Sequence, residues 1–275
     1  MSGVLYIVAT PIGNLSDITI RAVETLMRVD MVLAEDTRHS KKLFAHYEIH
    51  SPLIAFHEHN ESHKANGVIS EIRSGKSIAL ISDAGTPLIS DPGYQLVSQA
   101  KKLGIEVVPI PGPSAAIAAL SSSGIASSRF TFFGFLPTKQ PARLKLLKTK
   151  RSLNETIIFY ESPKRILSTM QDMLEAFGAN RDVCLAKELT KSYETILNDK
   201  LTNLIEYLID PNHQKGEFVI LVAPADKIDI DEAENQLDNI LNVLCAEMGA
   251  SKAAKLAARI TGIDKKYCYK KAINL

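Results

Sequence analysis

The sequence predicts an α/β protein built from two successive α/β domains and a small helical appendage. Up to Ile110, short apolar, β-rich runs alternate with helical segments, which is the pattern of a parallel sheet. The alternation resumes after a Pro/Gly joint, and the chain ends in two short helical segments separated by a turn. We therefore expect an N-terminal α/β domain at 1–111, a second α/β domain at 112–226 and the helical appendage at 227–275.

Four strands are expected in the first domain, and each leads into a loop. Thr19 is placed to cap the first of the intervening helices, and Gly75 and Gly104 are placed to end the other two. The strands are expected at 4–9, 31–34, 77–81 and 106–110, and the helices at 20–29, 68–73 and 94–103.

A small-residue helix at 114–120 opens the second domain, and four further strands follow it. A basic, turn-rich segment at 137–151 comes after the first of them, and the acidic, polar stretch 226–234 suits a linker. The strands are expected at 130–135, 156–160, 182–186 and 217–222.

The last segment combines a capped, Ala-rich helix at 251–260, a turn at 261–264 and a lysine-rich helix that begins at Lys265. This order is typical of a helix-turn-helix, and a helical hairpin that merely docks on the body is the alternative.

Composition limits the class of protein. The chain has 275 residues, 45% of them hydrophobic, and a formal net charge of +1, so nucleic-acid contacts would have to come from local basic patches. The three cysteines stand singly without metal-ligand spacing, as expected of free thiols in a reducing compartment. The amino terminus lacks a signal-peptide pattern, and no apolar run is long enough to cross a bilayer. We therefore expect a cytoplasmic protein without a membrane partner.

Three Pro/Gly loops follow strand ends at 10–14, 82–87 and 111–114. Ligands of open α/β sheets bind outside the carboxyl ends of the strands, and glycine lets the backbone approach a ligand closely. The loops thus indicate a small-molecule cleft, although each one alone is an ordinary turn. None matches the dinucleotide or P-loop phosphate motif.

Charged groups also gather at strand ends. The run 35–39 combines acids, a base and an arginine, and its alternative role is a helix cap by Asp36 or Thr37. The runs 161–165 and 187–191 place charges at two further strand ends, where surface ion pairs would explain them equally. The stretch containing His57, His59 and His63 could ligate a metal, but no Cys or third carboxylate completes a set, so no metal is expected.

Together the loops form a specific set that resembles the ribosomal small subunit methyltransferase I family, within the tetrapyrrole-methylase-like superfamily (class III methyltransferases). The resemblance runs in order over nearly the whole chain, and the carboxyl-terminal helical pair is similar to that family's helix-turn-helix appendage. The matching blocks are Ala9-Thr-Pro-Ile-Gly-Asn-Leu-Ser-Asp-Ile18, Ala34-Glu-Asp-Thr-Arg38, Ile81-Ser-Asp-Ala-Gly-Thr-Pro-Leu-Ile-Ser-Asp-Pro-Gly93, Pro109-Ile-Pro-Gly-Pro-Ser-Ala115, Gly134-Phe-Leu-Pro137, Tyr160-Glu-Ser-Pro163 and Lys187-Glu-Leu-Thr-Lys191.

The resemblance implies two α/β domains with S-adenosylmethionine between them, usually in a homodimer. It implies 2′-O-methylation of a cytidine of 16S ribosomal RNA at the decoding centre of the small ribosomal subunit. Carried over by motif, the expected donor-binding residues are Pro11, Asp83, Ala84, Gly85, Thr86, Pro87, Ser90, Ser114, Ala115, Leu189 and Phe218.

For catalysis we expect Asp36 or Glu161 to accept the hydroxyl proton, and Arg38 or Lys187 to hold the adjacent phosphate or the developing alkoxide. The residues expected to bind the RNA backbone are Arg38, Lys139, Arg143, Lys145, Lys266 and Lys270.

Two alternatives remain open. One is a tetrapyrrole methylase of the same superfamily, against which the loop 10–14 and the basic appendage count. The other is a non-catalytic RNA- or ribosome-binding protein, against which the intact Pro/Gly loops count.

Overall fold

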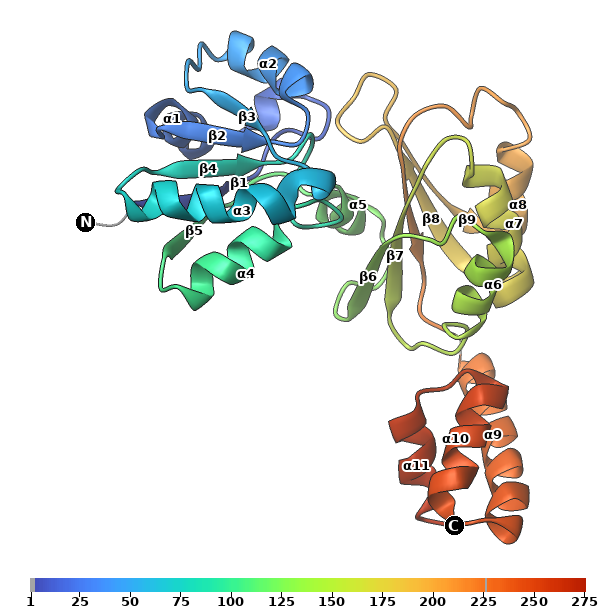
Figure 1. Ribbon diagram of the computed structural model, residues 1–275. Coiled ribbons are helices and arrows are strands. Elements are labelled where there is room, and N and C mark those ends of the chain that lie inside the picture. The colour runs from blue at the N-terminus through green and yellow to red at the C-terminus, as the bar shows by residue number, and fades with distance from the viewer. Residues whose placement is uncertain (1–2, 226) are drawn as a thin grey trace. The chain divides into compact units, whose positions relative to one another are not determined.

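The computed structural model describes residues 3–225 and 227–275 (Figure 1). The chain forms two compact units, which we call the first and the second unit. The first unit comprises 1–118 together with the short segment 188–194, and the second comprises 119–187 and 195–275. The division thus falls after Ala118, seven residues beyond the Pro/Gly joint at 111, because the chain after the joint continues into α5 (Ala115–Ser122).

The first unit contains a five-stranded sheet in which all strands are parallel, in the order β3-β2-β4-β1-β5. The predicted parallel sheet is therefore confirmed. The three-residue β3, which adds a strand at one edge, was not predicted from the sequence. The strands are β1 (Val4–Val8), β2 (Met31–Ala34), β3 (Leu53–Ala55), β4 (Ile78–Ile81) and β5 (Glu106–Ile110).

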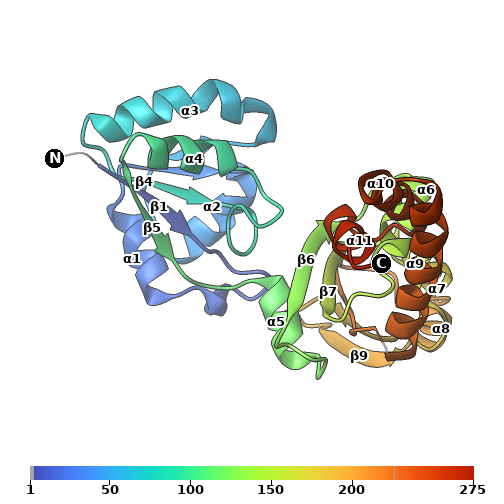
Figure 2. The same ribbon diagram turned by 90° about the horizontal axis from the view of Figure 1, so that it is seen from below.

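Helices cover both faces of this sheet because the buried strands carry apolar side chains on each side. One core joins the sheet to α1 (Ile20–Arg28) and α2 (Thr37–His46). The other joins it to α3 (Glu58–Arg73) and α4 (Tyr94–Lys102), which lie side by side (Figures 1 and 2). As expected, Thr19 caps α1, its Oγ1 accepting the Ala22 N–H at 3.2 Å.

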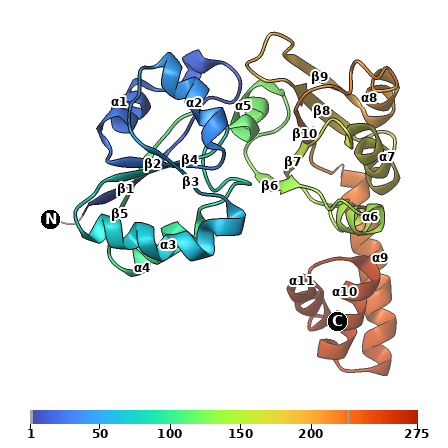
Figure 3. The same cartoon turned by 45° about the horizontal axis from the view of Figure 1, so that its top comes forward.

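The second unit contains a five-stranded mixed sheet in the order β6-β7-β10-β8-β9. Only β6 and β7 pair in parallel, and α6, α7 and α8 pack on one face around a large apolar core (Figure 3). The elements are β6 (Phe130–Phe135), α6 (Gln140–Lys148), β7 (Thr156–Glu161), α7 (Ile166–Phe177), β8 (Asp182–Lys187), β9 (Thr195–Lys200), α8 (Leu201–Tyr207) and β10 (Phe218–Val222).

Three helices end the chain: α9 (Lys227–Glu247), α10 (Ala250–Thr261) and α11 (Lys265–Ala272). The linker expected at 226–234 is wrong from residue 227 on, since α9 begins there, while Asp226 lies outside the described residues. The predicted helix-turn-helix is present. Gly262 ends α10 with a φ of 75°, and Asp264 caps α11 by accepting the N–H groups of Lys266 and Tyr267. These helices share a core of their own, which includes Leu237, Leu241, Ala253, Ala254, Ala257 and Cys268.

Candidate donor site and nucleic-acid surface

The loops after β1 and β4 are hydrogen-bonded to each other at the carboxyl edge of the first sheet. Thr10 and Gly85 form an isolated antiparallel bridge, with N···O distances of 2.9 and 3.0 Å. The Thr10 hydroxyl also donates to the Ser82 carbonyl at 3.2 Å. Gly85 has a φ of 82°, a conformation that glycine adopts without strain. The bridge therefore fixes two of the three predicted Pro/Gly loops relative to each other.

The third Pro/Gly loop, after β5, is joined to the same edge. The Thr86 hydroxyl donates to the Pro113 carbonyl at 3.0 Å. A Cβ on Gly112 would lie 3.0 Å from the Cβ of Ala9, closer than side chains ordinarily pack. Glycine thus lets this loop come close to the end of β1.

The loop after β2 completes the edge. The Asp36 N–H donates to Oδ1 of Asp83 at 2.9 Å, which ties the charged run 35–39 to the loop after β4. Asp36 also caps α2, because its Oδ1 accepts the Arg38 N–H at 2.8 Å. Asp36 therefore caps α2 and also lies at this edge of the sheet.

A segment from far along the chain joins this edge as well. The Asn14 N–H donates to the Thr190 hydroxyl at 3.0 Å, and a Cβ on Gly13 would fall 2.9 Å from the Leu189 carbonyl oxygen. This contact is why 188–194 belongs to the first unit. All of the expected donor-binding residues except Phe218 thereby lie in the first unit: Pro11, Asp83, Ala84, Gly85, Thr86, Pro87, Ser90, Ser114, Ala115 and Leu189.

Asp91 is a residue of this edge to which the sequence analysis assigned no role. Burial, together with the negative charges of Glu35 and Asp83, raises the pKa of its carboxyl to about 7, against the opposing effect of a hydrogen bond from Ser82. The sequence places Asp91 in a Pro/Gly turn, where a solvated carboxylate is the ordinary expectation. Only the fold reveals that three carboxyl groups share this place.

The edge has the chemistry that S-adenosylmethionine requires. The three Pro/Gly loops are held together at this edge, where their main-chain N–H and C=O groups can bind a flat, polar ligand. The donor carries a sulfonium and an ammonium group against one carboxylate, and the negative potential that raises the Asp91 pKa favours such a cation. The residues present therefore fit this donor.

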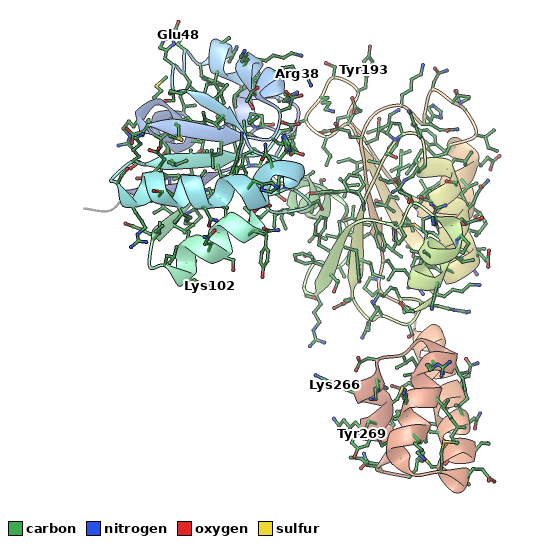
Figure 4. The ribbon with its side chains drawn as sticks, in the orientation of Figure 1. Arg38, Glu48, Lys102, Tyr193, Lys266 and Tyr269 are labelled. Atoms are coloured by element: carbon green, nitrogen blue, oxygen red, sulfur yellow. The ribbon has the colours of Figure 1, made fainter. Side chains whose placement is uncertain are left out.

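At the start of α2, the exposed Arg38 (Figure 4) forms a close pair with the half-buried Asp36. Nε and Nη2 of Arg38 donate to the two carboxylate oxygens at 3.1 and 2.8 Å, a bidentate geometry. Hydrogen bonds from the Arg38 side chain and backbone hold the pKa of Asp36 far below its usual range. The Arg38 side chain is 88% exposed, so the guanidinium can still meet a phosphate.

Glu161 lies in the second unit and has a different environment. Its carboxylate is buried and accepts hydrogen bonds from the Ser162 N–H at 2.7 Å, Arg165 Nε at 2.8 Å and the Thr169 hydroxyl at 2.7 Å. An ion pair with Arg165 completes the set. With both oxygens engaged inside the protein, Glu161 is placed to stabilise the end of β7 and the start of α7.

Glu161, Phe218 and Lys187 lie on three adjacent strands in direct register. The structure thus brings together the expected catalytic residues of the second unit and the expected donor-binding phenylalanine. Phe218 is buried, whereas Lys187 is half-buried and its Nζ donates to the Asn212 carbonyl at 3.2 Å.

Arg143 was expected to bind the RNA backbone, and the structure contradicts this. Its guanidinium is buried on α6, with Nε 2.6 Å from Oδ2 of Asp172 and Nη1 3.3 Å from the Thr138 carbonyl. A buried arginine paired in this way is a structural group, and the basic run gave no sign of it because its acidic partner is on α7. Lys139 and Lys145 of the same segment are exposed.

The last two helices present a strongly basic surface. Residues 250–275 contain seven Lys and Arg residues against one acid, Asp264, which gives a net charge of +6. Lys271 is paired with Asp238 at 2.9 Å. The other six are exposed and form no ion pair with another described residue: Lys252, Lys255, Arg259, Lys265, Lys266 and Lys270.

Metal-ligating groups and membrane-spanning helices were not expected from the sequence. Among the described side chains, no group of three His, Cys, Asp or Glu residues is placed to hold a metal, and the side chain of His59 lies outside those described. Within the described residues, no helix has the length and apolar character needed to cross a membrane.

The fold places the chain in a known class of proteins. Residues 4–205 match the family described as Tetrapyrrole (Corrin/Porphyrin) Methylases. The structure of diphthine synthase superposes with a TM-score of 0.64, covering 84% of this chain and 94% of that one at 15% identity. The cobalt precorrin-4 methyltransferase of cobalamin biosynthesis gives 0.58, covering 80% and 94% at 18% identity. The fold is therefore that of the tetrapyrrole methylases, which confirms the predicted fold class.

Closer relatives define the branch of this class. A Haemophilus influenzae protein named Ribosomal RNA small subunit methyltransferase I is 50% identical over 98% of this chain and 96% of its own length. Proteins of the same name from Escherichia coli O157:H7 and a Synechocystis species are 47% and 43% identical, also over nearly the full length. Residues 231–275 match the family described as RsmI C-terminal HTH domain. The chain belongs to the ribosomal RNA small subunit methyltransferase I family, as the sequence motifs indicated.

Proposed function

We propose that this protein transfers a methyl group from S-adenosylmethionine to the ribose 2′-hydroxyl of a cytidine in 16S ribosomal RNA of the small subunit. The observation that carries the proposal is full-length identity of about one half to relatives named for ribosomal RNA small subunit methylation. The edge of the first sheet supports it, because the joined Pro/Gly loops and clustered carboxylates there suit this donor.

We place the donor on the loops after β1, β4 and β5. The Thr10–Gly85 bridge and the Thr86 hydrogen bond to Pro113 hold these loops in one arrangement before any ligand binds. Such preorganisation lowers the cost of binding. Once bound, the donor supplies an activated methyl group whose bond to sulfur breaks as the bond to the ribose oxygen forms. Most of the rate enhancement can then come from alignment of the hydroxyl with that methyl group.

Of the two candidate proton acceptors, Asp36 is the better placed. Its side chain is 35% exposed at the edge of the first sheet and its oxygens bind the exposed Arg38, whereas Glu161 is buried and its oxygens are engaged by Ser162, Arg165 and Thr169. Because Arg38 keeps Asp36 ionised, the carboxylate remains able to accept a hydrogen bond from the ribose hydroxyl. Arg38 itself is exposed enough to hold the adjacent phosphate. For Lys187 we propose that its ammonium group stabilises the negative charge that develops on the ribose oxygen.

RNA would be held by exposed cations outside this edge. Lys139 and Lys145 are exposed on the second unit, and Lys266 and Lys270 belong to the basic surface of the last two helices. Contacts of this kind are made to phosphates and position the RNA without reading its sequence.

We further propose a cytoplasmic homodimer, which sedimentation would show as twice the mass of one chain.

Label transfer tests the proposal. The protein is incubated with S-adenosylmethionine that carries a radiolabelled methyl group and with purified small ribosomal subunits or free 16S RNA, and the RNA is digested to nucleosides. Label in 2′-O-methylcytidine is the expected result. Binding of the donor without any label in RNA would contradict the proposal and favour a small-molecule acceptor such as a tetrapyrrole.

A further inference from the structure

Tyr193 is an exposed aromatic residue of the first unit that no step above uses. Its side chain is 80% exposed, and it stands on the segment 188–194 that the chain of the second unit contributes to the first (Figure 4). Burial of a tyrosine ring is ordinarily favourable, so the exposed ring on this structured loop presents aromatic surface that a stacked base would cover.

The segment that carries Tyr193 is held in a fixed conformation. The Thr190 N–H donates to Oε2 of Glu194 at 2.6 Å, and Lys191 pairs with Glu188 at 3.0 Å. Glu188 and Thr190 have φ values of 51° and 66°, a region that costs energy for residues other than glycine. Strained, over-determined backbone of this kind occurs at binding sites, where it places a side chain accurately.

Hydrogen bonds connect this segment to the proposed donor site. Asn14, at the end of the loop after β1, donates its N–H to the Thr190 hydroxyl at 3.0 Å. The same loop is bridged through Thr10 to Gly85. Tyr193 is three residues from Thr190, so its ring belongs to the segment that contacts the loop after β1.

We propose that Tyr193 stacks on a base of the substrate RNA and so holds the target nucleotide at the edge where the methyl group is transferred. This inference rests on the proposed function and names the contact that presents the nucleotide. Proteins that bind unpaired RNA hold its bases by stacking them on aromatic side chains. Arg38, exposed on the same edge, would hold the phosphate while the ring holds the base.

Steady-state kinetics with small ribosomal subunits as the varied substrate test the inference. Tyr193→Ala removes the ring, Tyr193→Phe keeps it, and Leu103→Ala removes exposed apolar surface just after the end of α4 as the control. We expect Tyr193→Ala to lower kcat/KM for RNA about 5- to 150-fold, which corresponds to the loss of one stacked base of about 1–3 kcal/mol. Tyr193→Phe and Leu103→Ala should stay within about twofold of wild type on the same scale.

Two further readouts separate stacking from other roles. The donor dissociation constant and the salt dependence of RNA affinity should be the same in Tyr193→Ala as in wild type, because a neutral ring releases no counterions. An unchanged kcat/KM for RNA in an active Tyr193→Ala enzyme overturns the inference and leaves the proposed function intact. A change in sedimenting mass in that variant overturns it in favour of a subunit contact. Absence of label transfer by the wild-type protein overturns the proposed function and the inference together.

Discussion

Asp36 and Glu161 both follow strands, and their surroundings give the two carboxylates different chemistry. Asp36 is reachable by substrate and shares its oxygens with one exposed arginine. Glu161 has no exposed surface on its side chain and accepts hydrogen bonds from Ser162, Arg165 and Thr169. Removal of charge from the first should therefore affect turnover, and removal of charge from the second should affect stability.

The paired variants Asp36→Asn and Glu161→Gln test this division. With the donor saturating, Asp36→Asn should lower kcat by about 10²-fold, the lower end of the range for acid–base groups, and should leave unfolding nearly unchanged. Glu161→Gln should lower the free energy of unfolding by about 1–3 kcal/mol because Arg165 and Thr169 lose a charged partner. Near-normal turnover in Asp36→Asn would remove it from the mechanism.

Asp91 gives a pH dependence of stability with a definite sign. In the folded protein the pKa of its carboxyl is about 7, and in the unfolded chain it returns to 3.8. Between these values the unfolded chain has lost the proton that the folded protein keeps, so stability falls as the pH rises and levels off above 7. Asp91→Asn should flatten this fall in denaturant unfolding curves recorded from pH 4 to 8. Asp17→Asn removes a charge from the exposed end of the short 3-10 helix Leu15–Asp17 and serves as the control. Equal slopes in wild type and Asp91→Asn would refute the assignment.

Among the secondary-structure elements, α10 and α11 have a basic charge that predicts a measurable effect on RNA binding. Seven bases against one acid give residues 250–275 a net charge of +6, and six of the bases form no ion pair with a described residue. Cations of this kind bind phosphates and release counterions.

The double variant Lys266→Ala/Lys270→Ala measures that contribution. It should weaken binding of 16S RNA and reduce the slope of log affinity against log salt by about 1–2, since each phosphate contact contributes roughly 0.7–0.9. Lys101→Ala/Lys102→Ala removes the same charge from the exposed end of α4 and should leave the slope unchanged (Figure 4). Equal slopes in wild type and both variants would show that α11 does not bind RNA.

The elements that sequence patterns predicted well are short apolar strands bounded by loops. Strands β2, β5 and β6 begin and end where expected, because a short apolar run bounded by loops is a strong signal. The three-residue β3 escaped prediction because it exposes Ile54 and follows a proline. Helix α6 was taken for a turn because of Pro141, although proline is compatible with the first turn of a helix.

For the site, the sequence predicted which loops matter but not how their side chains pair. The three Pro/Gly loops do meet at one edge, as the rule for parallel sheets requires. The burial of Arg143 against Asp172 and the raised pKa of Asp91 depend on partners distant along the chain. Local patterns hold no information about such contacts, so Arg143 was misassigned and Asp91 was overlooked.

At the level of the whole chain, the first unit is completed by residues from the second half of the sequence. The segment 188–194 leaves the sheet of the second unit, contributes Leu189 and Thr190 to the loop after β1, and returns. The loops at this edge are thus supported by segments from both halves of the sequence. This arrangement is consistent with a family match that extends without interruption from 4 to 205.

The most direct test of the central claim is calorimetric titration of S-adenosylmethionine into wild type, Gly85→Ala and Gly67→Ala. Alanine at position 85 would have to adopt a φ of 82° and would lie 3.3 Å from Ile12, which disturbs the bridge between the loops after β1 and β4. The account predicts donor binding by wild type and at least about tenfold weaker binding by Gly85→Ala, a loss of about 1.4 kcal/mol. Gly67 lies in α3 with open space around its Cβ position, so Gly67→Ala should bind as wild type does and unfold less readily. Equal donor affinity in all three proteins would contradict the placement of the donor on the first unit.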